Sequence, residues 1–227
     1  MGYAESRLIV QNRANLGGKF VMLLPEPEQK LHAAQQEARW LADTAYKAAA
    51  AIARLNHPRM PGWLNNRLVN SNFNLQERGL CWHYEHDMYR ELRRRKLHYF
   101  RVGCCVRDQG RGSEHNCVYI TARNVAWPHV IVLDAWRYNG RLKIIEERDL
   151  NMEAWQDDPV SVRYLSQIYT ECHPYPIEHW ARVKSGRKWN DYVSSWSPEG
   201  TASRQGMLMQ YNMYMGLRQR DGKLTNY

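Results

Sequence analysis

A loop meets a helix in the stretch Arg78-Gly79-Leu80-Cys81-Trp82-His83-Tyr84-Glu85-His86, and a cysteine lies at the junction. The loop before it is rich in Asn, whereas the residues from Leu80 to Leu97 contain few helix breakers. We therefore expect a helix over 80–97 with Cys81 in its first turn. Unpaired N–H groups and the positive end of the helix dipole favour a thiolate in that position.

Cys81 also begins an apolar face of this helix. Tyr84, Met88 and Leu92 follow it at i+3, i+7 and i+11, which is the spacing of a face that packs inward. Two interpretations of the cysteine start from this position. It is either a reactive nucleophile or a small buried residue of the core.

Composition limits the classes of partner. The 227 residues carry a net charge of +9, but Lys and Arg are spread along the chain. The one tight basic block, Arg93-Arg94-Arg95-Lys96, falls in the predicted last turn of the Cys81 helix, where cations complement the dipole. A nucleic-acid partner is therefore possible but not favoured. The sequence does not determine an oligomeric state.

The cysteine content and the hydropathy of the chain indicate the cellular compartment in which we expect it. Five cysteines without a repeated Cys-x-x-Cys pattern favour free thiols in a reducing environment, hence the cytoplasm. No apolar run has the length of a transmembrane segment, and the N-terminus lacks the pattern of a signal peptide. A secretion signal removed earlier would leave the same sequence.

We predict a single domain over 1–227, with residues 1–65 forming an N-terminal arm and a long helix. In the arm, Leu8-Ile9-Val10 and Phe20 to Leu24 are interpreted as two strands or an extended segment. Pro25-Glu26-Pro27-Glu28 is typical of a helix start. The helix after it carries one apolar seam of mostly Ala, which favours packing on its own domain over a dimeric coiled coil. The seam consists of Leu31, Ala34, Ala38, Leu41, Ala45, Ala48, Ile52 and Leu55.

The pattern changes from helical to extended after the Cys81 helix. Strands are predicted at 99–107, 115–122 and 129–136, and Asn139-Gly140 is a strong hairpin signal before a fourth strand at 141–145. The fold class predicted is thus α+β, with a Cys-bearing helix packed on an antiparallel sheet. Residues 146–227 form an aromatic-rich C-terminal extension that we expect to wrap the core.

The hairpin of the second and third strands assembles a candidate site. Turning about residues 123–126, it places His115 directly opposite Asp134, so that both side chains project from one face of the sheet. If the Cys81 helix packs on that face, a nucleophile, a base and a residue that orients the base come together.

At this point the chain resembles the transglutaminase-like branch of the papain-fold cysteine enzymes. The resemblance is carried by Gly79-Leu80-Cys81-Trp82 at a helix start, Glu114-His115 at a strand start and Val132-Leu133-Asp134-Ala135-Trp136 on the next strand. Their order and spacing are similar to the compact core of that family. The resemblance covers about residues 66–145.

The resemblance implies an activity and a division of roles. Cys81 would attack an amide or ester carbonyl of a peptide or protein substrate, His115 would transfer the proton, and Asp134 would orient His115. The Cys81 backbone N–H and one further donor would hold the oxyanion, with Gln76 or Asn74 as candidates. No cofactor is implied. Three residues are expected to flank the site: Trp82, Glu114 and Trp136.

Two alternatives remain open. A catalytically silent papain-fold module would bind an anionic or polymeric partner through its charge and its C-terminal aromatic residues. A metal site could instead draw on Cys81, His83, His86, His115 and Cys117. Cys81 and His83 project to different sides of a helix, so a tetrahedral site that uses both is strained.

Overall fold

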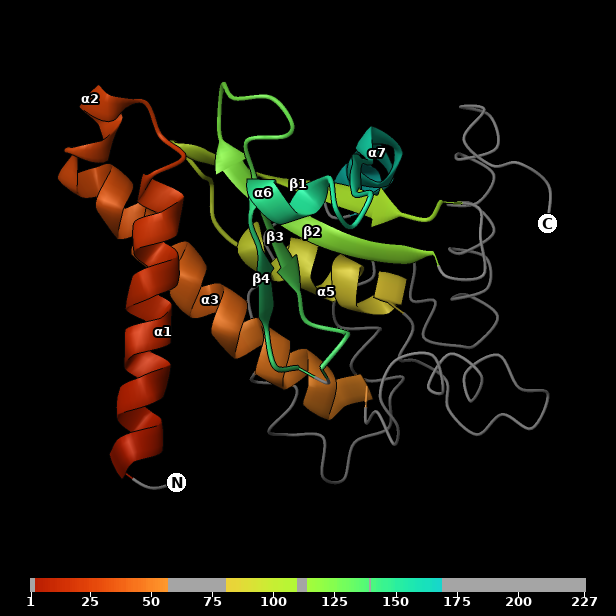
Figure 1. The fold of residues 1–227 in the computed structure, drawn as a ribbon, viewed down its shortest axis with the longest axis horizontal. Coiled ribbons are helices and arrows are strands. Elements are labelled where there is room, and N and C mark those ends of the chain that lie inside the picture. The colour runs from red at the N-terminus through yellow and green to blue at the C-terminus, as the bar shows by residue number, and fades with distance from the viewer. Residues whose placement is uncertain (1–2, 57–80, 110–113, 139, 169–227) are drawn as a thin grey trace.

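The computed structural model describes residues 3–56, 81–109, 114–138 and 140–168 (Figure 1). The helices are α1 (Tyr3–Val21), α2 (Glu26–Gln29), α3 (His32–Asn56), α5 (Cys81–Leu92), α6 (Glu147–Leu150) and α7 (Pro159–Ile168). The strands are β1 (Phe100–Arg107), β2 (His115–Ala122), β3 (Ile131–Asp134), β4 (Lys143–Ile145) and β5 (Gln156–Asp157). The predicted α+β class is confirmed for this part of the chain.

The sheet is antiparallel throughout, with strand order β4-β3-β2-β1-β5. The predicted four-stranded meander is therefore confirmed. The fifth strand, β5, was not predicted; its two residues pair with Cys105 and Val106 at the edge of β1. Residues 146–168 thus contribute to the sheet itself. The predicted wrapping role of 169–227 lies outside the described residues.

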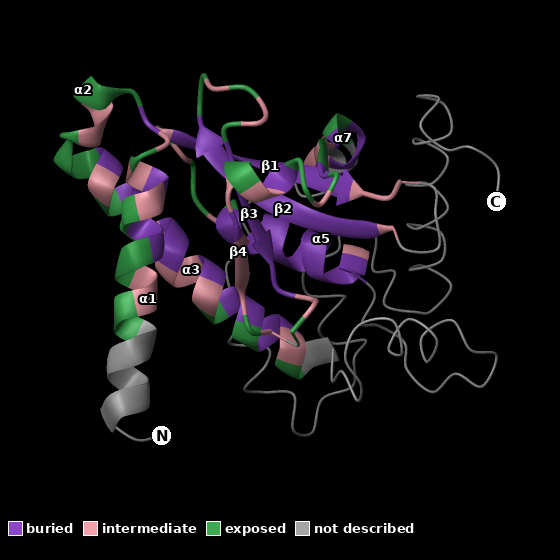
Figure 2. Ribbon diagram, viewed as in Figure 1, coloured by how far each residue is buried: buried purple, intermediate pink, exposed green. Residues whose placement is uncertain are grey.

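The two faces of the sheet are covered differently. Helices α1, α3, α5 and α7 share one apolar cluster with the first face, whereas a smaller cluster on the second face includes Leu150 of α6. Alternation along β2 divides its side chains accordingly: Val118 and Ile120 belong to the first cluster, Cys117 and Tyr119 to the second. Figure 2 shows that α5 and the central strands are buried along nearly their whole length.

Helix α5 has the predicted inward face, since Cys81, Tyr84, Met88 and Leu92 are all buried. It ends at Leu92, however, five residues before the predicted end. The basic block 93–96 therefore follows the helix instead of closing it. The guanidinium of Arg95 lies 4.0 Å from the ring of Trp40. This block therefore makes a cation–π contact with α3 instead of interacting with the dipole of α5.

The N-terminal strands predicted at Leu8–Val10 and Phe20–Leu24 are wrong, because one helix, α1, runs from Tyr3 to Val21. Leu16 and Phe20 are four residues apart and both are buried in the shared cluster, as expected for a helix face against α3. Gly17 lies close to α3, where a Cβ would make an ordinary contact of 3.6 Å with the Cα of Arg39.

The apolar seam is confirmed in α3, although the helix start was misplaced. Pro25 precedes the four-residue helix α2, and α3 begins only at His32. Leu31 falls between them and is 44% exposed, so it does not belong to the seam. The side chain of Leu55 lies outside the described set. The other six members are buried: Ala34, Ala38, Leu41, Ala45, Ala48 and Ile52.

The register predicted for β2 and β3 is wrong by two residues. That register implies that Val118 faces Ile131, whereas Val118 pairs with Leu133. The cause is the turn, because β3 begins at Ile131 and Trp127-Pro128 lies before it. Pro128 has no N–H to donate to the strand ladder. Since a shift of two residues preserves the sheet face, His115 and Asp134 still project from the same side.

The β3–β4 hairpin contacts α3 through a glycine. Gly140 has φ of 84°, and a Cβ there would lie 2.4 Å from the Cβ of Ala53. The position therefore requires both the backbone freedom of glycine and its lack of a side chain. This is the physical basis of the predicted Asn139-Gly140 signal, although Asn139 itself lies outside the described residues.

A buried carboxylate joins α3 to the beginning of β1. Glu37, 5% exposed, accepts hydrogen bonds from the backbone N–H groups of His98, Tyr99 and Phe100 at 2.9–3.1 Å. It provides acceptors for three donors just where the sheet starts.

We predict that Glu37→Ala lowers the free energy of unfolding by about 1–3 kcal/mol, because backbone donors lose a charged acceptor. Urea unfolding followed by circular dichroism measures the change. The matched control is Glu26→Ala, whose exposed carboxylate pairs only with exposed Lys30 among the contacts described and is expected to have almost no effect. Equal stability of the two variants would contradict the prediction.

Candidate functional site

The centre of the candidate site is a buried pair, His115 and Asp134. Nε2 of His115 lies 2.9 Å from Oδ2 of Asp134, and the two side chains are 2% and 0% exposed. His115 is the first residue of β2 and Asp134 the last of β3. Because the observed register does not place them directly opposite each other, the imidazole reaches diagonally across the strands to the carboxylate.

The Asp134 carboxylate is held on both oxygens. Its Oδ1 accepts hydrogen bonds from the backbone N–H groups of Trp136 and Arg137, both at 3.1 Å. Its Oδ2 faces His115 and also lies 3.3 Å from Nε of Arg137. Burial raises the pKa of Asp134, but His115 and Arg137 outweigh that effect and lower it to about 2. The carboxylate is therefore charged at neutral pH and fixed in orientation.

Cys81 reaches this pair from the other side of the sheet. We expected α5 to pack on the face that carries His115, and that is wrong: Tyr84 and Met88 of α5 pack in the cluster of the opposite face. The N-terminus of α5 instead lies level with the beginning of β2, where Sγ of Cys81 is 3.8 Å from the carbonyl oxygen of Glu114. The Cys81 thiol thus approaches the residue before His115 around the end of a strand.

Cys81 and His115 polarise each other. Burial raises the pKa of Cys81, but the hydrogen bond and charge of His115, with hydrogen bonds from Asn116, outweigh it and leave the pKa lowered. Burial lowers the pKa of His115, but Asp134 and then Cys81 outweigh it and raise that pKa to about 9. Both shifts favour the charged forms, a thiolate beside an imidazolium.

The ring of His115 is oriented by two indoles. Its centroid lies 4.9 Å from the Trp136 ring and 5.4 Å from the Trp155 ring. Nε2 of the ring faces Asp134, so Nδ1 is the ring nitrogen that the carboxylate does not engage. Trp136 was predicted to flank the site, whereas Trp155 was placed only in the wrapping segment.

Asn116 is a site residue that sequence reasoning missed. Its side-chain Nδ2 lies 3.6 Å from Sγ of Cys81 and 3.3 Å from Oε1 of Glu114. Its backbone N–H also contributes to lowering the pKa of Cys81. The only signal in the sequence was its place directly after His115.

Arg137 and Glu153 were missed as well, because their relation to Asp134 is tertiary. Nη2 of Arg137 lies 3.2 Å from Oε2 of Glu153, whose other oxygen is 2.6 Å from Nζ of Lys143. Burial raises the pKa of Glu153, but Lys143 and Arg137 outweigh it and lower it to about 2. This ion-pair cluster keeps Arg137 beside the Asp134 carboxylate.

The remaining predicted residues lie around the site or outside the description. Glu114 contributes its carbonyl to Cys81 and its carboxylate to Asn116. The Trp82 ring lies 3.8 Å from the His83 ring and 5.1 Å from the His86 ring. The oxyanion candidates Gln76 and Asn74 fall in 57–80, outside the described residues.

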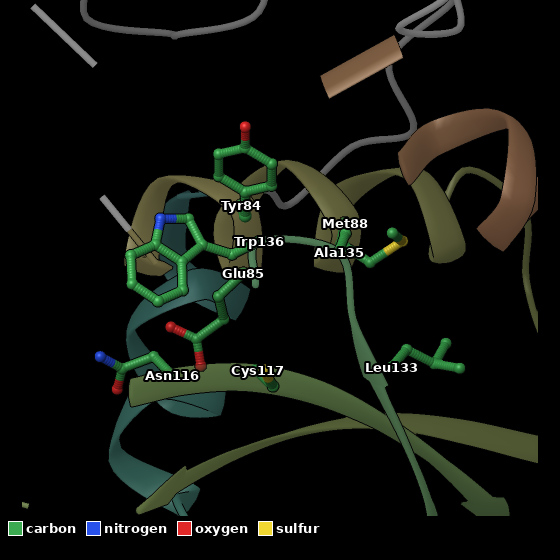
Figure 3. A pocket seen from close by; sticks show the side chains of 8 residues that line it. All are labelled: Tyr84, Glu85, Met88, Asn116, Cys117, Leu133, Ala135 and Trp136. Atoms are coloured by element: carbon green, nitrogen blue, oxygen red, sulfur yellow. The ribbon is translucent and has the colours of Figure 1, made fainter. Parts of the chain in front are cut away.

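A small cavity lies beside the candidate site, between α5 and the strands β2 and β3. Its volume is about 10 Å³, room for one water molecule. Figure 3 shows the carboxylate of Glu85, the amide of Asn116 and the indole of Trp136 around it. Cys117 also lines this cavity, so polar groups adjoin the site on the α5 side.

Comparisons with protein-family models, with curated proteins and with solved structures found no match to this chain. The functional argument therefore depends on the geometry of the site. Among the described helices, none combines the length and the apolar character needed to cross a bilayer.

The pKa values predict selective alkylation. Cys81 has a lowered pKa, whereas burial raises the pKa values of Cys104, Cys105 and Cys117 well above the ordinary value. Near neutral pH, iodoacetamide should modify Cys81 at least about 10-fold faster than the other three, because the thiolate is the reacting form. Peptide mass spectrometry over time measures each rate, and equal slow labelling of all four would contradict the assignment.

The charge of Asp134 should set the pH profile of that reaction. In Asp134→Asn the pKa of His115 falls from about 9, because burial lowers it and Cys81 alone remains of the two residues that raise it. Without an imidazolium beside it, the pKa of Cys81 rises, and the alkylation profile should move to higher pH by about one unit or more.

The matched control for this shift is Glu147→Gln, since Glu147 is an exposed carboxylate paired with His129. Its alkylation profile should coincide with that of the wild type. A profile in Asp134→Asn that coincides with both would show that the carboxylate does not act on the Cys81–His115 pair.

Proposed function

We propose that this protein is a cysteine-dependent amide hydrolase or acyl-transferase with the nucleophile Cys81, the base His115 and the orienting residue Asp134. The observation that carries the proposal is the polarised buried pair: a lowered Cys81 pKa, a His115 pKa of about 9, and 2.9 Å between Nε2 of His115 and Asp134. We further infer a papain-like, transglutaminase-like core. Its support is the order of the pieces, a Cys-bearing helix followed by antiparallel strands that carry His and Asp.

In the proposed reaction, the Cys81 thiolate attacks the carbonyl carbon of an amide. The C–S bond forms while the carbonyl π electrons move to oxygen. His115 then gives its Nδ1 proton to the nitrogen of the leaving amine, the C–N bond breaks, and a thioester remains. Water or an acceptor amine attacks the thioester, loses a proton to His115 and releases the acyl group, which restores the thiolate–imidazolium pair.

Asp134 contributes by fixing the imidazole. With Nε2–H bonded to the carboxylate, Nδ1 is the nitrogen that gives and takes the proton in each half of the reaction. The backbone donors on Oδ1 keep the carboxylate in place throughout. The charge of Asp134 also stabilises the imidazolium before the amine leaves.

Asn116 is the oxyanion donor we favour among the described residues. Its Nδ2 lies 3.6 Å from the Cys81 sulfur, so an oxygen on the attacked carbon would be within reach of the same amide. The predicted donors Gln76 and Asn74 remain alternatives for this role.

One observation favours the second candidate, a silent binding module on the same fold. Cys81 is only 5% exposed and His115 only 2%, so a substrate needs the site to open. Under that alternative, Cys81→Ala would keep the ability to bind a partner, and binding would weaken steeply with salt because the chain is basic.

The test of the proposed function is turnover of a peptide library containing side-chain and backbone amides, with and without a primary amine, followed by mass spectrometry. We expect Cys81→Ala to abolish turnover, while Cys104→Ala, which removes a buried thiol of β1, keeps it. Intact-mass analysis should show an acyl adduct on the wild type only. Turnover that persists in Cys81→Ala would overturn the proposal.

For the oxyanion role, we expect Asn116→Ala to lower kcat about 100- to 1000-fold with little change in KM, since the donor acts on charge formed in the transition state. The control is Asn151→Ala, because Asn151 is exposed just after α6. A loss confined to KM would assign Asn116 to substrate binding, and an unchanged kcat would exclude it as the donor.

A further inference from the structure

Cys117 is a thiol that the proposed reaction does not use, yet it lies within the site. It follows His115 by two residues on β2, so both side chains project from the same face of the sheet. Its Sγ lies 3.5 Å from Nε2 of His115, the same nitrogen that faces Asp134 at 2.9 Å. Sγ of Cys117 and Oδ2 of Asp134 thus both lie close to Nε2 of His115.

We propose that His115, Cys117 and Asp134 form a binding site for Zn²⁺, the ligand atoms being Nε2, Sγ and Oδ2. These three atoms lie within 4.8 Å of one another and all three residues are buried. Imidazole, thiolate and carboxylate are the donors that zinc takes in proteins, and three protein ligands leave a fourth position for water. The metal site considered from the sequence also drew on His115 and Cys117, but it combined them with Cys81, His83 and His86 and did not include Asp134.

The spacing of the ligand atoms fits a tetrahedral ion after a small adjustment. Ligands at about 2.0–2.3 Å from zinc lie about 3.3–3.7 Å apart in a tetrahedron. The 3.5 Å between Sγ and Nε2 already agrees, and the 2.9 Å between Nε2 and Oδ2 reflects a hydrogen bond that the metal would replace. That contact would open by a few tenths of an ångström, and Sγ and Oδ2, which lie within 4.8 Å of each other, would take the same spacing.

The surroundings also suit a metal. Oδ1 of Asp134 is occupied by two backbone N–H groups, so Oδ2 would be the coordinating atom, and Nε of Arg137 lies 3.3 Å from it. One thiolate and one carboxylate match the charge of Zn²⁺, and the charge of the neighbouring Arg137 is balanced by Glu153, 3.2 Å from its Nη2. Such hydrogen-bonded neighbours orient metal ligands.

The metal and the proposed catalysis exclude each other. Nε2 of His115 has a single lone pair, so it cannot bind zinc and at the same time donate a proton to Asp134. Binding releases that proton and the Cys117 thiol proton to the solvent. Zinc would therefore inhibit the enzyme through its base rather than its nucleophile, an inference that rests on the proposed function only for this last step.

The test uses the full chain and two metals. Zn²⁺ is titrated in competition with a chromophoric chelator, and Co²⁺ is added separately to look for the charge-transfer absorption of a thiolate ligand. We expect one equivalent to bind the wild type, and the affinity to fall at least about 10-fold in Cys117→Ser and Cys117→Ala, as loss of a ligand requires. Cys104→Ser, which removes a buried thiol on the opposite sheet face, should bind like the wild type.

Cys81→Ser separates this proposal from the proposed function. It should keep both the zinc affinity and the Co²⁺ charge-transfer band, although it has no nucleophile. A band lost in Cys81→Ser would assign the metal to the nucleophile and overturn the proposal. A wild type without the band, or Cys117 variants that bind zinc as tightly as the wild type, would overturn it as well. The wild-type spectrum decides even if a Cys117 variant does not fold, which circular dichroism would reveal.

Discussion

The hydrogen-bonded ion pair between His115 and Asp134 is the interaction on which the site depends. A carboxylate with no exposed surface is costly to bury unless charged donors and backbone N–H groups surround it. Here Trp136, Arg137 and His115 provide those donors. The same carboxylate raises the pKa of the imidazole, and the imidazolium in turn lowers the pKa of Cys81. Burial alone would favour the neutral form of each group. Because the groups are buried together, their opposite charges instead stabilise one another.

The sheet converts this pair into a site by joining segments far apart in the sequence. β2 delivers His115 at its first residue and β3 delivers Asp134 at its last, while α5 brings Cys81 to the same end from the opposite face. The position of the thiol at a helix terminus is what allows contact around the strand end. A cysteine one or two turns later in α5 would face the apolar cluster with Met88 and Leu92. The architecture therefore explains why a catalytic assignment is reasonable for Cys81 and not for Cys104 or Cys105.

Much of the fold followed from local patterns. The 3–4 spacing of Ala34, Ala38 and Leu41 predicted a buried helix seam, and the residues from His115 to Ala122 predicted a strand with the observed bounds. These predictions succeeded because burial imposes a period on the sequence. The N-terminal helix was missed because short apolar runs such as Leu8–Val10 fit a strand and a helix equally well. The strand β5 was missed because two polar residues carry no periodicity.

The sequence by itself determined the chemical types in the site, their order and the sheet face shared by His115 and Asp134, since alternation along a strand is a local property. The tertiary structure alone decided the β2–β3 register, the side from which Cys81 approaches, and the roles of Asn116, Arg137 and Trp155. Those features depend on the length of the Pro128 turn and on contacts between segments distant in the chain. No local pattern encodes such distances, because they arise only when packing brings the segments together.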